Sequence, residues 1–144
     1  MFRAIVREAK IIDAPLITEL SEQLGYQVTK DDLRTRLENL IQDNYHVIYV
    51  AEVYDKVVGW VHVCIYKTLL SEKTATILGL VVDQTFHRQG IGTMLMRQAE
   101  DWAKDCCCHR IILKSNMIRQ DAHSFYKGIG YECVKSQYVF AKHF

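Results

Sequence analysis

A short glycine-containing loop carries the residues best suited to bind a phosphate. It reads His87-Arg88-Gln89-Gly90-Ile91-Gly92-Thr93 and lies between an apolar segment and an amphipathic one. If a helix begins here, its first backbone amides are unpaired and its N-terminus carries about half a positive charge. Glycines let a phosphate approach those amides closely, and Arg88 adds a fixed cation. The loop therefore predicts a site for a diphosphate-bearing ligand.

The glycine pattern alone is not specific. It is neither the full dinucleotide fingerprint nor a P-loop, because no Gly-Lys-Ser/Thr follows. A helix start that uses glycine for close packing is one alternative, and a generic nucleotide-binding α/β domain is another. The predicted strands and helices around the loop help to distinguish these interpretations.

Strand and helix signals alternate along the chain. β-Branched and aromatic runs predict strands, and apolar residues at helical spacing predict helices. Asp13 and Thr29 are predicted N-caps, the second in a capping box with Asp32. Predicted strands cover residues 2–8, 46–53, 57–66, 74–83, 110–115 and 131–141. Predicted helices follow Asp13 and Thr29, cover 90–104 and include 122–129.

The order of these elements predicts an α/β fold. Strands 46–53 and 57–66 form a hairpin, and residues 74–115 form a crossover unit with a parallel strand pair. The sheet is mixed and mostly antiparallel, with about four helices. A single proline and seven scattered glycines leave no linker, so residues 1–144 are predicted to form one domain. The buried stripe of the second helix is predicted to be Leu33, Leu37, Leu40 and Ile41.

Two motifs resemble the GNAT superfamily of N-acetyltransferases. The first is Leu80-Val81-Val82-Asp83-Gln84-Thr85-Phe86-His87-Arg88-Gln89-Gly90-Ile91-Gly92. The second, Arg119-x-Asp121-Ala122-His123-x-Phe125-Tyr126-x-x-x-Gly130-Tyr131, resembles the closing helix of the family. Both occur in the family's order and spacing, over about residues 46–141. The resemblance implies acetyl-CoA as acetyl donor and a bulge that splays the parallel central strands apart.

The resemblance also implies roles for individual residues. The backbone of Leu80, Val81 and Val82 would pair with the pantetheine arm, and backbone amides in the loop would hold the pyrophosphate. Tyr126 would protonate the leaving thiolate as a general acid, with packing beside Phe125 as the alternative. The family carries Arg or Gln where His87 stands, so a cofactor contact from that side chain is not implied. The loop residues concerned are Arg88, Gln89, Gly90, Ile91, Gly92 and Thr93.

The sequence does not identify the general base. Relatives carry a carboxylate near positions that here hold Leu78 and Gly79, and other family positions hold Lys114 and Arg119. Deprotonation through water is one alternative. The candidate side chains are His62, Glu52, Asp83 and His123.

The implied reaction is direct attack of a primary amine on acetyl-CoA in a ternary complex. A small-molecule amine is the predicted acceptor, with a polyamine like an aminoglycoside, a protein N-terminus or a lysine as alternatives. A cofactor-binding sensor without turnover is the rival function. In the family the first two helices and residues 67–74 shape the acceptor site, and their carboxylates and aromatics suit a cation, with an ordinary charged surface as the favoured alternative for any one residue. They include Tyr26, Asp31, Asp32, Glu38, Tyr45 and Glu72.

Composition narrows the partners. The net charge is +1 and no Lys/Arg run occurs, so no nucleic-acid partner is predicted. No apolar run reaches about 20 residues, and residues 1–10 lack a signal core, which predicts a cytoplasmic protein without a membrane segment. Five cysteines, three of them adjacent at 106–108, suit a reducing compartment and form no metal-site pattern. A last strand ending at Phe144 predicts a homodimer through edge pairing.

Overall fold

The computed structural model describes residues 3–115 and 120–144. Contacts divide the chain into two units, Met1–Lys114 and Ser115–Phe144. The first unit holds a five-stranded sheet, and the second holds helix α4 (Gln120–Gly128) and the segment after it. The prediction of one domain over residues 1–144 stays a prediction.

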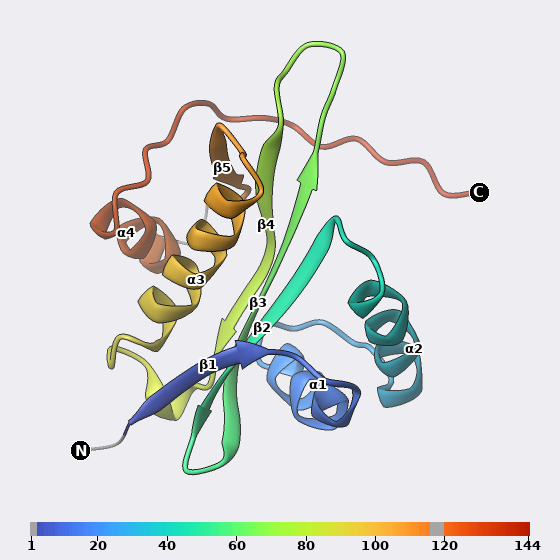
Figure 1. Cartoon of the computed structure of the whole chain (residues 1–144), viewed down its shortest axis with the longest axis vertical. Helices are drawn as coiled ribbons and strands as arrows, with labels where there is room; N and C mark the ends of the chain where they lie inside the picture. Colours follow the sequence, from blue (N-terminus) through green and yellow to red (C-terminus); the bar gives the residue numbers. More distant parts are fainter. Residues whose placement is uncertain (1–2, 116–119) are drawn as a thin grey trace. The chain divides into compact units, whose positions relative to one another are not determined.

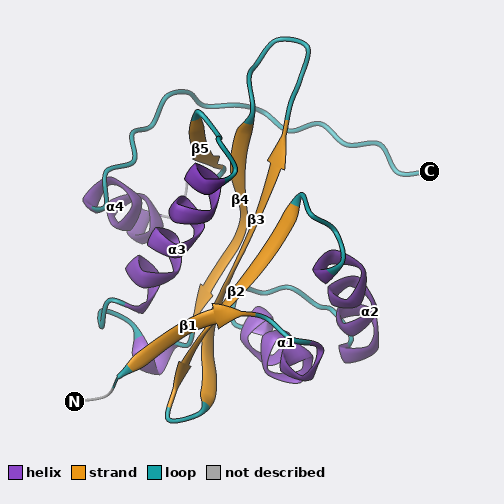
Figure 2. Ribbon diagram, in the orientation of Figure 1, coloured by secondary structure: helices purple, strands orange, loops and turns teal. Residues whose placement is uncertain are grey.

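The strands of the first unit lie in the sheet in chain order. Neighbours from β1 to β4 pair antiparallel, whereas β4 and β5 pair parallel. Figure 2 shows β3 and β4 running side by side through the sheet. The predicted α/β class, mixed sheet and parallel pair are confirmed. The strands are β1 (Ala4–Glu8), β2 (His46–Val53), β3 (Lys56–Tyr66), β4 (Thr74–Val82) and β5 (Arg110–Leu113).

Helices cover both faces of the sheet. Figure 1 shows α1 (Ala14–Glu22) and α2 (Lys30–Ile41) on one face, and α3 (Ile91–Asp105) on the other. The apolar cluster under α1 and α2 includes Leu20 and Leu37, with Trp60 packed against it. No helix among the described residues is long and apolar enough to cross a membrane.

The helix starts differ from prediction in one respect. Thr29 caps α2 as predicted, because its hydroxyl accepts from the Asp32 amide at 3.1 Å. Asp13 stands at the cap position of α1, but its carboxylate is bound by Arg7 through two 2.8 Å contacts and by the Lys10 amide. The ion pair therefore competes successfully with the helix amides. Ile41 is 44% exposed, because it ends α2 and lies beyond the buried stripe.

Two one-residue bulges interrupt the antiparallel ladders. The hairpin turn between β2 and β3 is two residues long, and Tyr54 and Asp55 both adopt left-handed φ angles of 51° and 62°. Beyond that turn, Val58 is an extra residue of β3, because Glu52 pairs with Val57 while Ala51 pairs with Gly59. Each bulge shifts the register of the residues that follow it.

The second bulge lies where the central strands part. His62 pairs with Gly79 and Val63 with Ile77, which makes Leu78 the extra residue of β4. Pairing between β4 and β5 ends at Ile77, although β4 continues to Val82. The remainder of β4 therefore has no strand beside it on the β5 side, among the strands that the structure describes.

The predicted C-terminal strand is wrong. Figure 2 shows the segment after α4 as loop throughout, and residues 131–144 form no strand. Their β-branched and aromatic residues match strand propensity, but a strand also needs a partner ladder. Of the other predicted bounds, residue 2 lies outside the described residues, and β5 ends at Leu113 instead of Ser115. The segment exposes Val134, Tyr138, Val139, Phe140 and Phe144.

Candidate functional site

A tight turn follows β4 and begins the loop. Asp83 precedes the 3₁₀ turn η2 (Gln84–Phe86), and its carboxylate accepts from the Thr85 amide at 3.0 Å and from the Thr85 hydroxyl at 2.9 Å. The hydrogen bond from the Thr85 amide lowers the pKa of Asp83. The backbone amide of Asp83 also donates to the carbonyl of Val58 at 2.8 Å. Asp83 therefore shapes the turn.

His87 fastens the loop to the end of β4. Its Nε2 lies 2.7 Å from the carbonyl oxygen of Val82. Sequence reasoning missed this contact, because it treated the residue only as a departure from the Arg or Gln of the family. The five-residue separation from the strand end was the available signal, since an imidazole there can reach back to the strand.

The start of α3 has the features of an anion site. Arg88 and Gly90 adopt left-handed φ angles of 62° and 83°. A Cβ built on Gly90 would meet nothing within 4 Å, so open space adjoins this backbone. No side chain caps α3 and no acidic residue lies in its first turn. Because the first amides of a helix have no intrahelical acceptor, this backbone fits a phosphate group.

The predicted cofactor residues lie in one continuous stretch around this turn. Leu80 and Val82 are half-buried, and Val81 is buried against the α1/α2 cluster. The loop residues Arg88 to Gly90 are exposed, while Ile91 anchors the helix in the core. The half-paired end of β4 thus leads directly into the open amides of α3.

Tyr126 lies on α4 in the second unit. Its ring packs edge-on against Phe125, with centroids 5.2 Å apart, and against Tyr131 at 6.1 Å. Both the packing role and the acid role remain compatible with these contacts. Arg119, part of the same motif, lies outside the described residues.

The four candidate bases have different surroundings. The carboxylate of Glu52 lies 2.7 Å from the guanidinium of Arg7, and that of Asp83 is bound within its turn. His62 meets His46 across the β2–β3 ladder, with Nε2 of His62 2.9 Å from Nδ1 of His46. His123 lies on α4 and has interaction partners.

A surface cavity of about 610 Å³ is lined by the end of α1 and the residues that follow it. It lies in the connection between α1 and α2, which a hydrogen bond of 3.2 Å from the Gln84 amide to the Gln23 side chain ties to η2. The cavity combines a carboxylate and a phenol with backbone groups. Its lining residues are Glu22, Gly25, Tyr26, Gln27, Val28 and Thr29.

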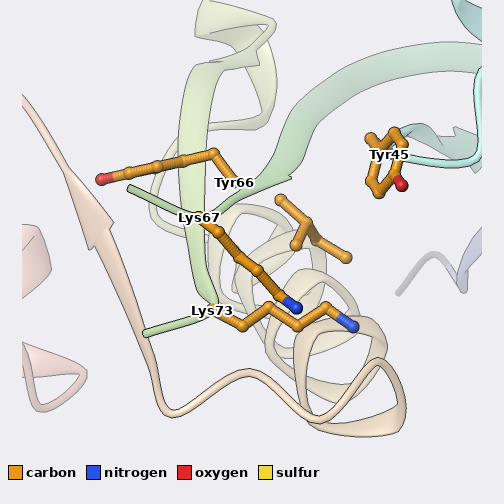
Figure 3. A pocket seen from close by; sticks show the side chains of 5 residues that line it. Tyr45, Tyr66, Lys67 and Lys73 are labelled. Atoms are coloured by element: carbon orange, nitrogen blue, oxygen red, sulfur yellow. The ribbon is translucent and has the colours of Figure 1, made fainter. Parts of the chain in front are cut away.

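A second cavity, of about 370 Å³, lies far from the loop. In Figure 3, Lys67 and Lys73 extend in the same direction beside Tyr45. The carbonyl of Lys73 accepts from the amide of His109, just beyond the C-terminus of α3. The loop lies at the opposite end of that helix, about 22 Å away along its axis. We therefore assign this second cavity no part in the site.

Two of the predicted acceptor carboxylates are already paired. Glu38 lies 3.2 Å from Arg34, and Glu72 lies 2.7 Å from His109. Tyr26 lines the cavity after α1, whereas Tyr45 lines the distant one. The remaining two, Asp31 and Asp32, lie in the first turn of α2.

The cysteines provide no nucleophile of evident reactivity. All five are free. Cys106 stands at the C-cap of α3, and burial raises the pKa of the Cys108 thiol. No group of three or more His, Cys, Asp or Glu side chains suited to a metal ion occurs in the described parts of the chain.

Comparisons with known proteins agree with this geometry. The model of the acetyltransferase (GNAT) family matches residues 14–131. An uncharacterised N-acetyltransferase of Chlorobaculum tepidum is 28% identical over 134 residues, which are 92% of this chain and 78% of that protein. Glucosamine-6-phosphate N-acetyltransferase of Arabidopsis thaliana superposes with a TM-score of 0.81 at 25% identity, covering 99% of both chains.

A structure solved with CoA gives a further comparison. An aminoglycoside N-acetyltransferase in complex with CoA superposes with a TM-score of 0.90 at 14% identity, covering 99% of this chain and 96% of that one. At this identity the likeness concerns the fold. The family match extends from α1 to the end of the second motif, and so includes both motifs found in the sequence. The chain therefore belongs to the GNAT family of acetyl-CoA-dependent acetyltransferases.

Proposed function

We propose that the protein transfers the acetyl group of acetyl-CoA to the primary amine of a small molecule, by direct attack in a ternary complex. The observation that supports this proposal is that two backbone segments with hydrogen-bonding groups unpaired among the described residues follow one another in the chain. Among the described strands, none pairs with the end of β4, from Leu78 to Val82, on the β5 side, and this end leads into the uncapped start of α3. An extended arm with a diphosphate at its end matches both.

The cofactor roles follow from these features. In the stretch Leu80–Val82, the backbone groups that point away from β3 would pair with the pantetheine arm, although the carbonyl of Val82 already accepts from His87. The amides from Arg88 to Thr93 would hold the pyrophosphate. Bound acetyl-CoA supplies an activated acetyl thioester. Tyr126 would deliver a proton to the sulfur that departs, because a phenol is an ordinary general acid.

The cavity between α1 and α2 supports a small amine as acceptor. Its volume of about 610 Å³ falls in the range of small-molecule sites. Glu22 and Tyr26 line it, and a carboxylate with an aromatic ring favours a cationic amine. The bond between Gln23 and Gln84 ties the end of α1, next to this cavity, to the turn that follows β4.

Turnover against a defined set of amines tests the proposal. The set contains neamine, glucosamine 6-phosphate, spermidine, free amino acids and short peptides, with products identified by mass spectrometry. An acetylated small molecule is expected. Acetylation of peptides alone would replace the small-molecule acceptor. Intact acetyl-CoA binding without any product would instead favour a sensor.

A variant of Tyr126 tests the acid role. Tyr126→Phe removes one hydroxyl and is expected to lower kcat by ~100-fold while the Kd of acetyl-CoA is unchanged. Tyr138→Phe is the matched control, because Tyr138 is 88% exposed in the loop after α4. An unchanged kcat in Tyr126→Phe would assign the ring to packing alone.

The proposal extends to assembly and location. The exposed apolar residues of 131–144 would add to the β5 edge of a second copy, since β5 pairs only with β4 among the described strands. A dimeric mass in light scattering, reduced to monomeric when the segment is removed, is expected. The five free thiols support a reducing compartment such as the cytoplasm.

A further inference from the structure

Two imidazoles meet on the sheet face that α1 and α2 cover. His46 lies on β2 and His62 on β3, with ring centroids 5.1 Å apart and Nδ1 of His46 2.9 Å from Nε2 of His62. Two ring nitrogens can share a hydrogen bond only if one carries hydrogen and the other a lone pair. The tautomers of the two rings are therefore linked.

Asp43 sets the direction of this link. Its Oδ2 lies 3.9 Å from Nε2 of His46, too far for a hydrogen bond but near enough for the negative charge to favour a hydrogen on that nitrogen. In a neutral His46 the Nδ1 then carries a lone pair, so Nε2 of His62 must donate to it. This arrangement leaves Nδ1 of His62 without hydrogen and able to accept a proton.

The position of His62 is the one a base would need. His62 pairs with Gly79 at the bulge, and its neighbour Val61 pairs with Leu80. This is the point where β4 has parted from β5, on the stretch that the proposed function gives to the acetyl donor. Trp60 lies on the same face, and its buried Nε1 has no partner in the described parts of the chain. The indole N–H of Trp60 and the imidazole of His62 thus lie on the same face of the sheet.

The structure argues against Glu52 and Asp83 as the general base. Glu52 is held by Arg7 through two contacts of 2.7 and 2.8 Å, and the Asp83 carboxylate is bound by Thr85. Neither carboxylate has the freedom of a base that must accept a proton and release it. His62, in contrast, contacts His46 and through it approaches Asp43, whose side chain is 43% exposed.

We propose that His62 is the general base and that His46 and Asp43 form its proton exit. As the amine nitrogen forms its bond to the acetyl carbon, its N–H bond breaks and the proton passes to Nδ1 of His62. The hydrogen on Nε2 of His62 moves to Nδ1 of His46, whose imidazolium rests beside Asp43 and returns the proton to solvent. The carbon–sulfur bond breaks, its electron pair stays on sulfur, and the sulfur takes a proton from the Tyr126 hydroxyl, which solvent then reprotonates. This proposal rests on the proposed function.

The lowered pKa of His62 suits a base that passes its proton on to another group. Burial, and secondarily the charge of His46, lower the pKa of His62 to about 4, so this ring is neutral at neutral pH. The side chain of His46 is 24% exposed and lies nearer to Asp43. Cys64 lies on this face opposite His46 in the ladder, and burial raises its pKa, which keeps the thiol neutral. Arg7 and Glu52 lie further along the same face and are paired with each other. Asp43 is therefore the charged neighbour of the pair.

The kinetic test compares three histidine variants, using the amine of the above set with the highest kcat/KM. His62→Gln is expected to lower kcat/KM by ~100-fold and to remove the fall of the wild-type rate as the pH drops toward 4, because the imidazole that is protonated there is gone. His46→Gln is expected to lose about tenfold. His109→Gln is the matched control, since this histidine is 67% exposed and paired with Glu72, and its profile should equal the wild type. The Kd of acetyl-CoA should be unchanged in all three.

A second measurement uses the unmodified protein. Nitrogen-15 NMR of the imidazoles should show both His46 and His62 as Nε2–H tautomers, which holds even if His62→Gln fails to fold. The opposite tautomer of His62, or a His62→Gln enzyme within about twofold of wild type, would overturn the role of His62 alone. A wild-type protein that acetylates no amine would overturn the proposed function, and the role of His62 with it.

Discussion

The indole ring of Trp60 lies across Gly79 of the neighbouring strand. A Cβ built on Gly79 would stand 2.6 Å from one ring carbon of Trp60 and 2.7 Å from another, closer than packed carbon atoms approach. The two residues lie beside the bulge at Leu78. Glycine at residue 79 is thus what allows the ring to lie flat at the point where β4 leaves β5.

Substitution of this glycine should displace the ring. Gly79→Ala is expected to lower the free energy of unfolding by about 1–3 kcal/mol, because the Cβ overpacks a half-buried site. Chemical denaturation measures the loss, and Trp60 fluorescence in a Trp102→Phe background reports the ring. Gly128→Ala is the control, since its Cβ would meet nothing within 4 Å. Unchanged fluorescence and stability in Gly79→Ala would contradict the close contact.

Gly90 should matter for its backbone angle and for its ligand separately. Gly90→Ala and Gly25→Ala place a Cβ at φ angles of 83° and 85°, with open space around both. Each is expected to cost about 1 kcal/mol of stability. Only Gly90→Ala should weaken acetyl-CoA binding, by about tenfold, because the new methyl group obstructs the approach of a phosphate to the amides. Calorimetric titration measures the Kd of acetyl-CoA for both variants. Equal Kd values would show that Gly90 is not part of the acetyl-CoA site.

The ion pair at the start of α1 should be worth far more than a surface pair. Asp13→Asn leaves the guanidinium of Arg7 without one of its two carboxylates, and Asp13 is only 5% exposed. The expected loss of stability is about 2 kcal/mol. Glu38→Gln, which breaks the exposed pair with Arg34, should cost about 0.3 kcal/mol. Thermal unfolding measures both, and similar losses would contradict the role of burial.

Stability should fall in mild acid through His62. The unfolded ring takes up a proton near its ordinary pKa of 6.5, whereas the folded ring does so only at about 4. Between these values the unfolded state binds more protons, so stability is complete above pH 6.5 and declines as the pH falls toward 4. The decline is about 2 kcal/mol once partial solvent screening is allowed for. His62→Gln should flatten it, and equal slopes for both proteins in denaturation series would refute this account.

Local signals predicted the fold and the loop, because each depended on neighbouring residues. Glycine spacing located the start of α3, and Thr29 located that of α2. The strand prediction for the segment 131–144 was wrong, because its residues have strand propensity but no partner among the described strands. The roles of Leu80, Val81, Val82 and Tyr126 came from the resemblance and stay predictions.

The histidine pair could not be predicted, because it depends on a bulge. With a regular ladder after the turn at Tyr54 and Asp55, His46 would face Val63 and His62 would point to the other side of the sheet. The extra residue Val58 shifts the register by one, so His46 pairs with Cys64 and shares a face with His62. A bulge leaves no clear mark in a single sequence, and a one-residue shift reverses every side chain.

The half-paired strand β4 also bears on how the protein behaves in storage. Strand edges with free amides and carbonyls attract other strands, and sheet proteins aggregate through them. Within the first unit as described, the stretch from Leu78 to Val82 is such an edge, and the exposed side chain of Leu78 makes it apolar as well. A ligand that lay along it would shield the edge as well as react. Protein kept without acetyl-CoA should therefore precipitate sooner than protein kept with it.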